Sequence, residues 1–330
     1  MPARKPFSKD IILLEDVEQV VDNIVEQLRA DVLHRFKRHG AVVGISGGID
    51  SSVCLALAVE AFGPDKVLGI MLPEKDSSPD SEMLARELAA RFGVKALKEE
   101  ITGALSGFGC YERRDEAVKR VFPEYEPKTW KMKIGIRQSG LFNNIPPIFY
   151  LTVIDPAGNT KDKILPANEY LQIVAASNFK QRTRMSMLYY HAEALHYCVV
   201  GTPNKHEQEQ GFFVKYGDGA GDVMPIGNLY KTQVYQLAEF MGVPKGIVER
   251  TPTTDTYSAE QTQEEFFYQL PFHLMDRFWY GFENGYPAAE VAAVMGETTE
   301  RVEALFRNFE RKRKTTEYLR MPPIRDYYNG

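Results

Sequence analysis

The chain has 330 residues, of which 44% are hydrophobic and 26% are charged, and its formal net charge is -5 at pH 7. This length and composition indicate a globular protein with a substantial core, in one large domain or two smaller ones. The acidic balance and the lack of a long basic stripe argue against nucleic acid as a partner. No apolar run is long enough to span a membrane and the first residues lack an apolar signal core, so we expect a cytoplasmic protein.

The hydrophobic pattern alternates between helical and strand periods. Apolar residues from Val17 to Phe36 recur at spacings of three and four, which predicts an amphipathic helix. Short apolar runs predict buried strands at 41–46, 67–72 and 197–202. Helical stretches separate these runs, near 51–62, 80–92 and 180–196. The alternation predicts an α/β fold with a doubly wound, Rossmann-like parallel sheet, whose ligands lie beyond the carboxyl ends of the strands, after Ile45, Leu72 and Val200.

The segment 102–177 breaks this alternation. It is rich in glycine and proline, and it contains a predicted hairpin with strands at 149–154 and 161–165. Long segments of this kind often cover active sites, so we expect an insertion or a lid. Beyond Tyr257 the pattern is helical, at 265–280, 288–295 and 299–318. We therefore expect a single domain, 1–330, with the insertion and a helical C-terminal region, 258–330.

The most informative motif is Ser46-Gly47-Gly48-Ile49-Asp50-Ser51-Ser52, which follows the first predicted strand and opens a helix. Adjacent glycines let backbone N–H groups approach a phosphate, the serines add hydroxyl donors, and the helix presents its positive end. No lysine follows the glycines, so the motif is not a Walker loop. Asp50 beside a polyphosphate indicates a divalent cation between the two anions. The motif therefore predicts a site for ATP and Mg²⁺.

This motif resembles the signature of the N-type ATP pyrophosphatases, of the adenine nucleotide alpha hydrolase-like superfamily. These enzymes cleave ATP between the α and β phosphates and adenylate a substrate. An ordered set of further motifs resembles the ammonia-dependent NAD synthetase family: Asn178-Phe-Lys-Gln-Arg182-Thr-Arg184-Met185, Gly201-Thr202-Pro-Asn-Lys-His-Glu207, Gly211-Phe-Phe-Val-Lys215-Tyr-Gly-Asp218, Asp222, Lys231 and Pro252-Thr253-Thr254-Asp255. The resemblance extends over most of 15–102 and 178–321. It implies a ligase that adenylates the nicotinate carboxylate of deamido-NAD, amidates it with ammonia, and releases AMP and pyrophosphate.

The resemblance also implies roles for single residues. Asp50 and Glu207 are expected to bind Mg²⁺, as hard oxygen ligands. ATP is expected to contact the loop residues together with Thr202, Lys231 and Thr253. Lys231 would stabilise charge on the departing pyrophosphate, which makes Asp50 and Lys231 the expected catalytic residues. Deamido-NAD is expected to contact Arg182, Arg184, Lys215, Asp222 and Lys312. From chemistry alone, several of these side chains could equally lie on a solvated surface, so the assignments depend on the order of the motifs.

Other functions stay open at this point. The chain departs from the family pattern at Pro203, Val214 and Thr254, and its insertion is longer than the usual family connection, so a paralogous amide ligase for another carboxylic acid is an alternative. A sulfur-transferring pyrophosphatase would need a reactive thiol, for which only Cys110, in a Gly-rich and charged stretch, is a candidate. A nucleotide-binding module without turnover is a third possibility.

The expected partners are small molecules. The resemblance implies a homodimer with its substrate near the interface. The chain shows no added amidohydrolase domain, and it starts with Met1-Pro2 rather than with the terminal cysteine of some glutaminases. We therefore expect free ammonia, or a separate ammonia-supplying glutaminase, as the nitrogen source.

Overall fold

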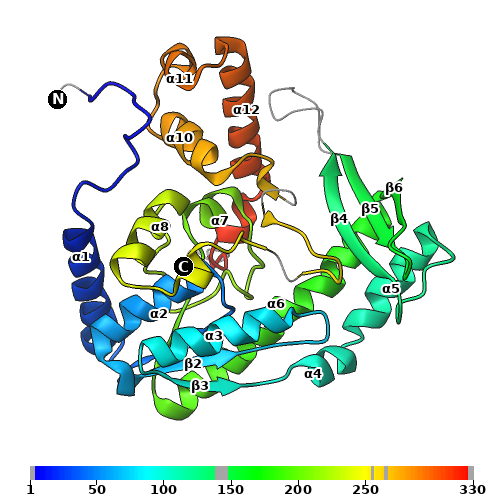
Figure 1. Ribbon diagram of the computed structural model, residues 1–330, viewed down its shortest axis with the longest axis horizontal. Helices are drawn as coiled ribbons and strands as arrows, with labels where there is room; N and C mark the ends of the chain where they lie inside the picture. Colours follow the sequence, from blue (N-terminus) through cyan, green and yellow to red (C-terminus); the bar gives the residue numbers. More distant parts are fainter. Residues whose placement is uncertain (1–3, 138–147, 254–255, 264–266, 326–330) are drawn as a thin grey trace.

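A parallel four-stranded sheet forms the centre of the structure, a computed structural model that describes residues 4–137, 148–253, 256–263 and 267–325 (Figure 1). The strand order is β3–β2–β1–β7, with bounds Lys95–Lys98, Val67–Met71, Ala41–Gly44 and Cys198–Val200. Ala41 of β1 lies opposite Val67 of β2 and Cys198 of β7. All three predicted strands are therefore confirmed. The edge strand β3 was missed, because its lysine-rich, half-exposed sequence lacks a buried apolar run.

Helices cover both faces of this sheet, which confirms the doubly wound α/β fold. Alternate strand residues point to opposite faces, so Val42 and Val43 belong to different apolar clusters. The cluster around Val43 includes residues of α1, α2, α3 and α8 (Val17–Arg29, Ile49–Phe62, Pro79–Arg91 and Lys231–Phe240). The cluster around Val42 includes residues of α4, α5 and α6 (Thr102–Gly107, Cys110–Val121 and Ala167–Leu195). The predicted first helix continues beyond α1 as a π-helical turn, η1 (Ala30–Arg35).

A small antiparallel sheet lies beside the central body, at the right of Figure 1. It has the order β4–β5–β6, with bounds Lys131–Arg137, Ile148–Ile154 and Thr160–Ile164. The predicted hairpin is confirmed as β5 and β6, with Thr152 opposite Asp162. Strand β4 was missed, although Met132 and Ile134 alternate with polar residues in the period of a strand.

Helix α6 corrects two expectations about the insertion. It begins at Ala167, so the boundary expected at 177 falls inside a continuous helix. Arg182 and Arg184 were expected to open a helix, but they lie in the interior of this one. Before the small sheet, α4 and α5 already pack against the central body through Leu105 and Tyr111. The segment 102–177 is therefore only partly separate from the core.

The C-terminal region forms its own helical layer, drawn in orange and red in Figure 1. Its helices are α10 to α13, with bounds Phe272–Glu283, Ala288–Met295, Thr299–Thr315 and Glu317–Arg320. They pack around a buried aromatic cluster that includes Trp279 and Phe309. The helix expected at 265–280 is interrupted: Phe267 and Tyr268 have π-helical geometry, and α10 begins at Phe272, after Pro271 at its N-cap. Residues 264–266 lie outside the described part. The helix expected at 299–318 ends at Thr315.

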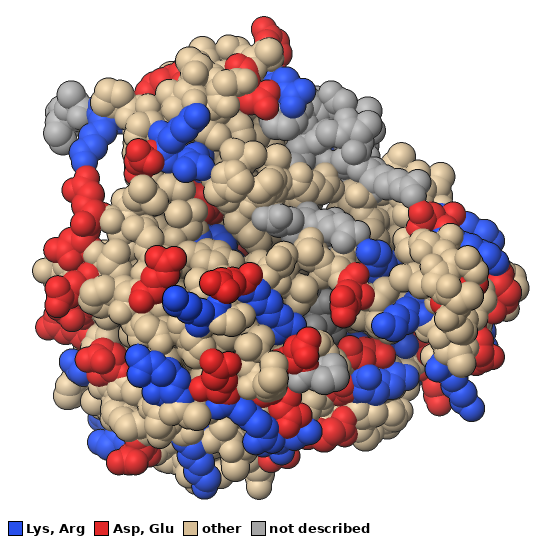
Figure 2. Space-filling view, in the orientation of Figure 1, with Lys and Arg blue, Asp and Glu red and all other residues tan. Residues whose placement is uncertain are grey.

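Short helices complete the chain: η2, α7 and α9 (Pro64–Lys66, Lys205–Gln210 and Lys245–Val248). Across the described residues, none of the helices has the length and hydrophobicity needed to cross a membrane. On the face drawn in Figure 2, lysines and arginines are interspersed with aspartates and glutamates rather than gathered in one basic patch. Charge on this face therefore offers no continuous track for a polyanion.

Candidate active site

The loop between β1 and α2 has a geometry that only glycine permits at its centre. Gly47 has φ +71°, and a Cβ there would lie 2.8 Å from the carbonyl oxygen of Ser81. The loop is held by its own serines: the Gly48 N–H donates to Ser46 Oγ at 3.3 Å, and Ser51 Oγ donates to the Gly48 carbonyl at 3.0 Å. The N-terminus of α2 is thereby fixed at the carboxyl end of β1.

A pocket opens directly at this helix end. Its lining comes from the loop, from the segments after β7, from the start of α8 and from residues 247–263: Ser46, Gly48, Ile49, Asp50, Ser51, Thr202, Glu207, Lys231, Ile247, Arg250, Thr251, Pro252, Thr253 and Gln263. Segments more than 200 positions apart in the sequence thus meet at the edge where a doubly wound sheet binds ligands. The structure brings together most of the residues predicted for ATP and Mg²⁺.

Two predicted loop residues lie behind the pocket rather than in its lining. Gly47 packs against α3, as its close approach to Ser81 shows. Ser52 is fully buried, and its hydroxyl donates to the Gly48 carbonyl at 2.8 Å. Both residues shape the loop from within. Their contact with ATP stays a prediction.

The pocket contains two carboxylates and one ammonium group. Lys231, the first residue of α8, is fully buried, and its ammonium contacts the Asp50 carboxylate. Burial lowers the pKa of a lysine, but the charges of Asp50 and Glu207 outweigh it and raise the pKa of Lys231. Burial and the charge of Asp50 raise the pKa of Glu207 to about 8 despite the opposing effect of Lys231. Lys231 contacts Asp50, whereas Glu207 forms no ion pair among the described residues, so a bound cation would stabilise the buried Glu207 carboxylate.

Asn204, which sequence reasoning missed, fixes this pair of carboxylates. Its side-chain oxygen caps α7 by accepting the Glu207 N–H at 3.2 Å, while Glu207 Oε2 accepts the Asn204 N–H at 2.9 Å. Asn204 Nδ2 also donates to Asp50 Oδ1 at 3.3 Å. The sequence carried a signal for this arrangement, because Asn followed three positions later by Glu is typical of a capping box.

Arg250 and Gln263 line the pocket and were also missed. They lie in a stretch without regular period, and only the neighbouring Pro252 and Thr253 belong to a quoted motif. The guanidinium of Arg250 donates to Ser81 Oγ at 3.3 Å, which ties this stretch to α3. Of the motif at 252–255, Thr254 and Asp255 lie outside the described residues.

The five residues predicted to bind deamido-NAD are absent from the described pocket lining. Arg182 is exposed and donates to the carbonyl of Lys215 at 3.3 Å. Lys215 itself donates to the carbonyls of Tyr318 at 2.7 Å and Met321 at 2.8 Å. Two of the five thus lie side by side under the C-terminal segment.

The other three candidates make different contacts. Arg184 donates to the Leu72 carbonyl, where β2 ends, at 3.2 Å. The Asp222 carboxylate accepts the Val199 N–H at 2.8 Å beside the sheet. Lys312 donates to the carbonyl of Phe267 at 3.1 Å and lies 4.2 Å from the centre of its ring, and burial lowers its pKa to about 8. Their binding roles stay predictions.

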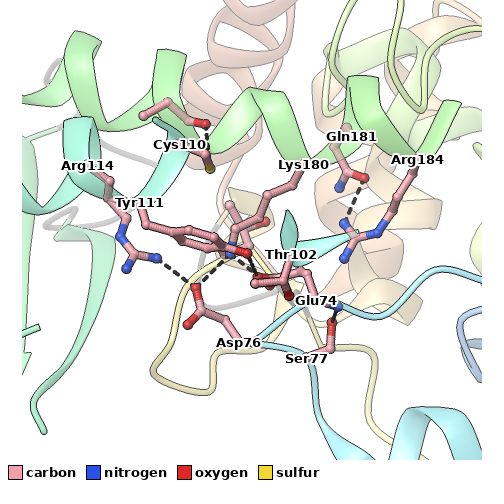
Figure 3. Close-up of polar contacts among 12 residues, drawn as sticks. Glu74, Asp76, Ser77, Thr102, Cys110, Tyr111, Arg114, Lys180, Gln181 and Arg184 are labelled. Carbon is pink, nitrogen blue, oxygen red and sulfur yellow. Dashed lines mark hydrogen bonds and ion pairs between the residues drawn. The ribbon is translucent and has the colours of Figure 1, made fainter. Parts of the chain in front are cut away.

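The segment after β2 was expected at the same edge as the loop, but its acids face the insertion. Figure 3 shows Glu74 and Asp76 pointing toward Lys180 of α6 and toward side chains of α5. Lys180 Nζ donates to Glu74 Oε1 and to Asp76 Oδ2, each at 2.9 Å, and to the Thr256 carbonyl at 3.0 Å. Arg114 and Tyr111 of α5 donate to Asp76 and Glu74, both at 2.7 Å. We call these five side chains the Lys180 cluster.

The thiol required for sulfur transfer is not presented by this chain. Cys110 begins α5 rather than lying in an open loop; it is fully buried and donates to the Ala176 carbonyl at 3.2 Å. Burial raises the pKa of Cys110, and also those of Cys54 and Cys198, so each of the three cysteines stays a protonated thiol. Cys54 and Cys198 are buried as their apolar contexts predicted.

Comparisons with known proteins agree with this fold and site. The family model described as NAD synthase matches residues 20–125 and 150–316. The NH(3)-dependent NAD(+) synthetase of Mesorhizobium japonicum is 49% identical, over 95% of this chain and 98% of the relative. The enzyme of the same name from Rhizobium meliloti is 46% identical, over 97% and 95%. The stretch that the family model leaves unmatched, 126–149, is much shorter than the expected insertion.

A solved structure extends the likeness to the fold. The NH3-dependent NAD synthetase of Campylobacter jejuni, in complex with nitrate, superposes with a TM-score of 0.60 at 19% identity, over 94% of this chain and all of that one. The family model covers well over half of the chain, and the two curated relatives align along nearly all of it. The chain belongs to the NAD synthase family.

Proposed function

We propose that this chain makes NAD from deamido-NAD, ATP and ammonia. The observation that carries the proposal is the pocket where the N-terminus of α2, Asp50, Glu207 and Lys231 meet at the carboxyl edge of the sheet. Relatives at 46 and 49% identity over nearly the whole chain carry the name NH(3)-dependent NAD(+) synthetase. Neither observation favours a different acid as the substrate.

The ATP phosphates fit the end of α2. Backbone N–H groups at a helix N-terminus bind anions, and Ser46 and Ser51 add hydroxyl groups beside them. Lys231 supplies the positive charge that the loop lacks, at the point where pyrophosphate would leave. Thr202 and Thr253 line the same pocket and are proposed to contact the rest of ATP.

Asp50 and Glu207 are the proposed ligands of Mg²⁺. Magnesium in nucleotide sites is usually bound by one or two carboxylates, with phosphate oxygens and water as the remaining ligands. The donor set fits this pattern, and burial together with the charge of Asp50 raises the pKa of Glu207, which a bound cation would offset. When bound, the ion would neutralise the triphosphate and help pyrophosphate to leave.

The reaction needs no nucleophile from the protein. An oxygen of the nicotinate carboxylate attacks the α-phosphorus, a carbon–O–phosphorus link forms, and the bond between the α-phosphorus and the bridging oxygen breaks to release pyrophosphate. Ammonia then attacks the acyl carbon, AMP leaves with the linking oxygen, and the surplus proton passes to solvent. The chain contributes by aligning two anions and lowering their repulsion.

Deamido-NAD is the proposed acid substrate. The candidates for its anionic and hydroxyl groups are Arg182, Arg184, Lys215, Asp222 and Lys312. We also propose a homodimer that works in the cytoplasm, with free ammonia or a separate glutaminase as the nitrogen source. Sedimentation of the purified chain tests the dimer, since a monomer at all concentrations would contradict it.

The deciding experiment incubates the chain with ATP, Mg²⁺ and ammonium, with and without deamido-NAD. NAD is followed by mass spectrometry, and AMP and pyrophosphate are followed in the same samples. We expect equal amounts of the three products, and none without deamido-NAD. Pyrophosphate release triggered by a different carboxylic acid, with no NAD formed from deamido-NAD, would overturn the proposed substrate.

A further inference from the structure

A chain of buried hydrogen bonds runs through the molecule beside the pocket. It joins four helices, α12, α7, α10 and α8, through five side chains: Lys312, Gln210, His206, Asp276 and Thr232. Gln210, His206 and Asp276 are completely buried. The reaction described above uses none of these three residues, although His206 lies within the quoted motif 201–207.

The contacts are close and continuous. Lys312 Nζ lies 3.4 Å from Gln210 Oε1, and Gln210 Nε2 lies 3.2 Å from His206 Nδ1. His206 Nε2 lies 2.5 Å from Asp276 Oδ1. Asp276 Oδ2 accepts the Thr232 N–H at 2.7 Å and also contacts the Thr232 hydroxyl.

The hydrogen bonds have a defined direction. Burial alone would raise the pKa of Asp276, but hydrogen bonds and charge from His206, together with Thr232, lower it, so the carboxylate is ionised. It accepts the Nε2 proton of His206, whose Nδ1 then accepts the amide N–H of Gln210. The remaining oxygen of Gln210 faces the Lys312 ammonium. Each hydrogen-bond donor in the series thereby faces an acceptor.

Two members of this hydrogen-bonded series are next to residues of the pocket. His206 directly precedes Glu207 on α7, and Thr232 directly follows Lys231 on α8. Asp276 binds His206 with one oxygen and Thr232 with the other, so it sets the spacing between the first turns of the two helices. We propose that His206 and Asp276 are positioning residues that fix Glu207 relative to Lys231 and connect both to Lys312.

A role in packing alone does not explain these residue types. His206 is surrounded by aromatic rings, with Tyr230, Tyr268 and Trp279 at centroid distances of 5.8, 6.0 and 5.9 Å. Apolar side chains of similar volume would fill such a site without the cost of burying a charge. Hydrogen bonds, unlike apolar contacts, impose direction and distance. The hydrogen-bonded pair of His206 and Asp276 therefore gives this interface a fixed geometry.

The test is Asp276→Asn, which keeps the shape of the side chain. Its amide N–H₂ must face His206 Nε2 if its oxygen is to keep the Thr232 N–H. The imidazole proton then moves to Nδ1, and Gln210 must turn its NH₂ group toward the Lys312 ammonium. Two hydrogen-bond donors would then face each other, so the variant cannot form all the hydrogen bonds between Lys312 and Thr232 at once.

This inference rests on the proposed function, so the wild type is first assayed for NAD. We expect Asp276→Asn to lower kcat about ten- to a hundredfold, with a smaller change in KM, because small displacements of reacting groups have effects of this size. The matched control is Val302→Ala, a buried substitution in the same C-terminal cluster but away from the hydrogen bonds. It should lower the unfolding midpoint and leave kcat unchanged.

A second pair of variants keeps the test decisive if Asp276→Asn does not fold. His206→Gln retains an N–H that can donate to Asp276, whereas His206→Leu does not. We expect His206→Gln to be about tenfold more active than His206→Leu, the effect of a hydrogen bond to a charged group. Equal kcat values for the two, or a kcat of Asp276→Asn within twofold of Val302→Ala, would overturn the positioning role.

A failure of the proposed function gives a different result. If the wild type makes no NAD, the same variants are compared by calorimetric binding of ATP with Mg²⁺, which needs no acid substrate. The positioning role then predicts severalfold weaker binding to Asp276→Asn than to Val302→Ala. Equal binding would overturn it independently of the reaction.

Discussion

Two regions of the molecule hold buried acids against buried cations, and they differ in whether each acid forms an ion pair. In the Lys180 cluster, Asp76 accepts from both Arg114 and Lys180. Burial opposes its ionisation, but these two cations lower the pKa of Asp76. In the pocket, the Lys231 ammonium contacts Asp50, while Glu207 forms no ion pair among the described residues and burial raises its pKa.

This difference indicates that the Lys180 cluster anchors elements of the fold, whereas the pocket binds a ligand. A buried acid with two cationic partners is stable as it stands and joins α5 and α6 to the loop after β2 (Figure 3). A buried acid without an ion-pair partner, such as Glu207, is stabilised when a cation or a proton binds to it. The acid without an ion-pair partner lies where ATP and Mg²⁺ are proposed to bind. The fully paired acids lie where the insertion joins the core.

The largest effect is expected when the pocket loses the ammonium group of Lys231. Lys231→Met should lower the rate of pyrophosphate release about a hundred- to a thousandfold, because it removes the charge that stabilises the leaving group. Lys245→Met is the matched control, since Lys245 is likewise the first residue of a helix, α9, but is exposed and outside the pocket lining. Rates for the two variants within threefold of each other would contradict the role of Lys231.

The corresponding change in the Lys180 cluster should affect stability. Lys180→Met leaves Glu74 and Asp76 without a shared cation in a buried site, where removing one partner of a buried ion pair typically costs about 3–5 kcal/mol. The free energy of unfolding is measured by denaturant titration, with the exposed Lys66→Met as the control. A loss below about 1 kcal/mol would show that the cluster does not anchor the insertion.

Sequence reasoning reached one of these regions and not the other, for a physical reason. The pocket residues follow strand ends, and parallel strands bring their ends to one edge, so Asp50, Thr202 and Glu207 could be predicted to meet. The Lys180 cluster depends on how two helices pack, and Lys180 is 106 positions from Glu74. No local period or motif contains that contact.

Contacts between distant helices were also unpredictable from the sequence within the site itself. His206 and Asp276 are 70 positions apart, on helices whose contact the sequence does not predict. No local period or motif marks Arg250 or Gln263 as a pocket residue. The capping box at Asn204 and the alternation that marks β4 were readable from local pattern. The fold was therefore more predictable than the contacts between its layers.

Neutralising one acid in each region should change stability in opposite directions. Asp76→Asn should cost about 1–3 kcal/mol at pH 7, since it weakens hydrogen bonds to two charged donors. The folded-state pKa of Asp76 is lowered, so its stabilisation is present above the unfolded value of 3.8 and is lost as pH falls through the folded value. The loss caused by Asp76→Asn should therefore shrink in acid.

Glu207→Gln should instead stabilise the chain when no ligand is added. The folded-state pKa of Glu207 is raised from 4.5 to about 8, so the folded chain holds more protons and the wild type loses stability as pH rises across that interval. The variant lacks this loss and should be equal to the wild type near pH 4.5 and more stable near pH 8. Denaturant titrations at the two pH values, without Mg²⁺ or ATP, measure this difference. A Glu207→Gln variant that is less stable than the wild type at pH 8 would contradict the raised pKa of Glu207.

The smallest effect concerns Lys312, whose ammonium donates to Gln210 and to the Phe267 carbonyl and forms no ion pair among the described residues. Because burial lowers its pKa from 10.5 to about 8, its charge is largely lost between pH 7 and pH 9. If Lys312 binds an anionic group of deamido-NAD, the KM for deamido-NAD should rise up to about tenfold over this interval, at constant free ammonia. Lys312→Arg, which stays charged, should remove the rise. The same pH dependence in both proteins would place the titrating group elsewhere and leave Lys312 without a role in binding the acid.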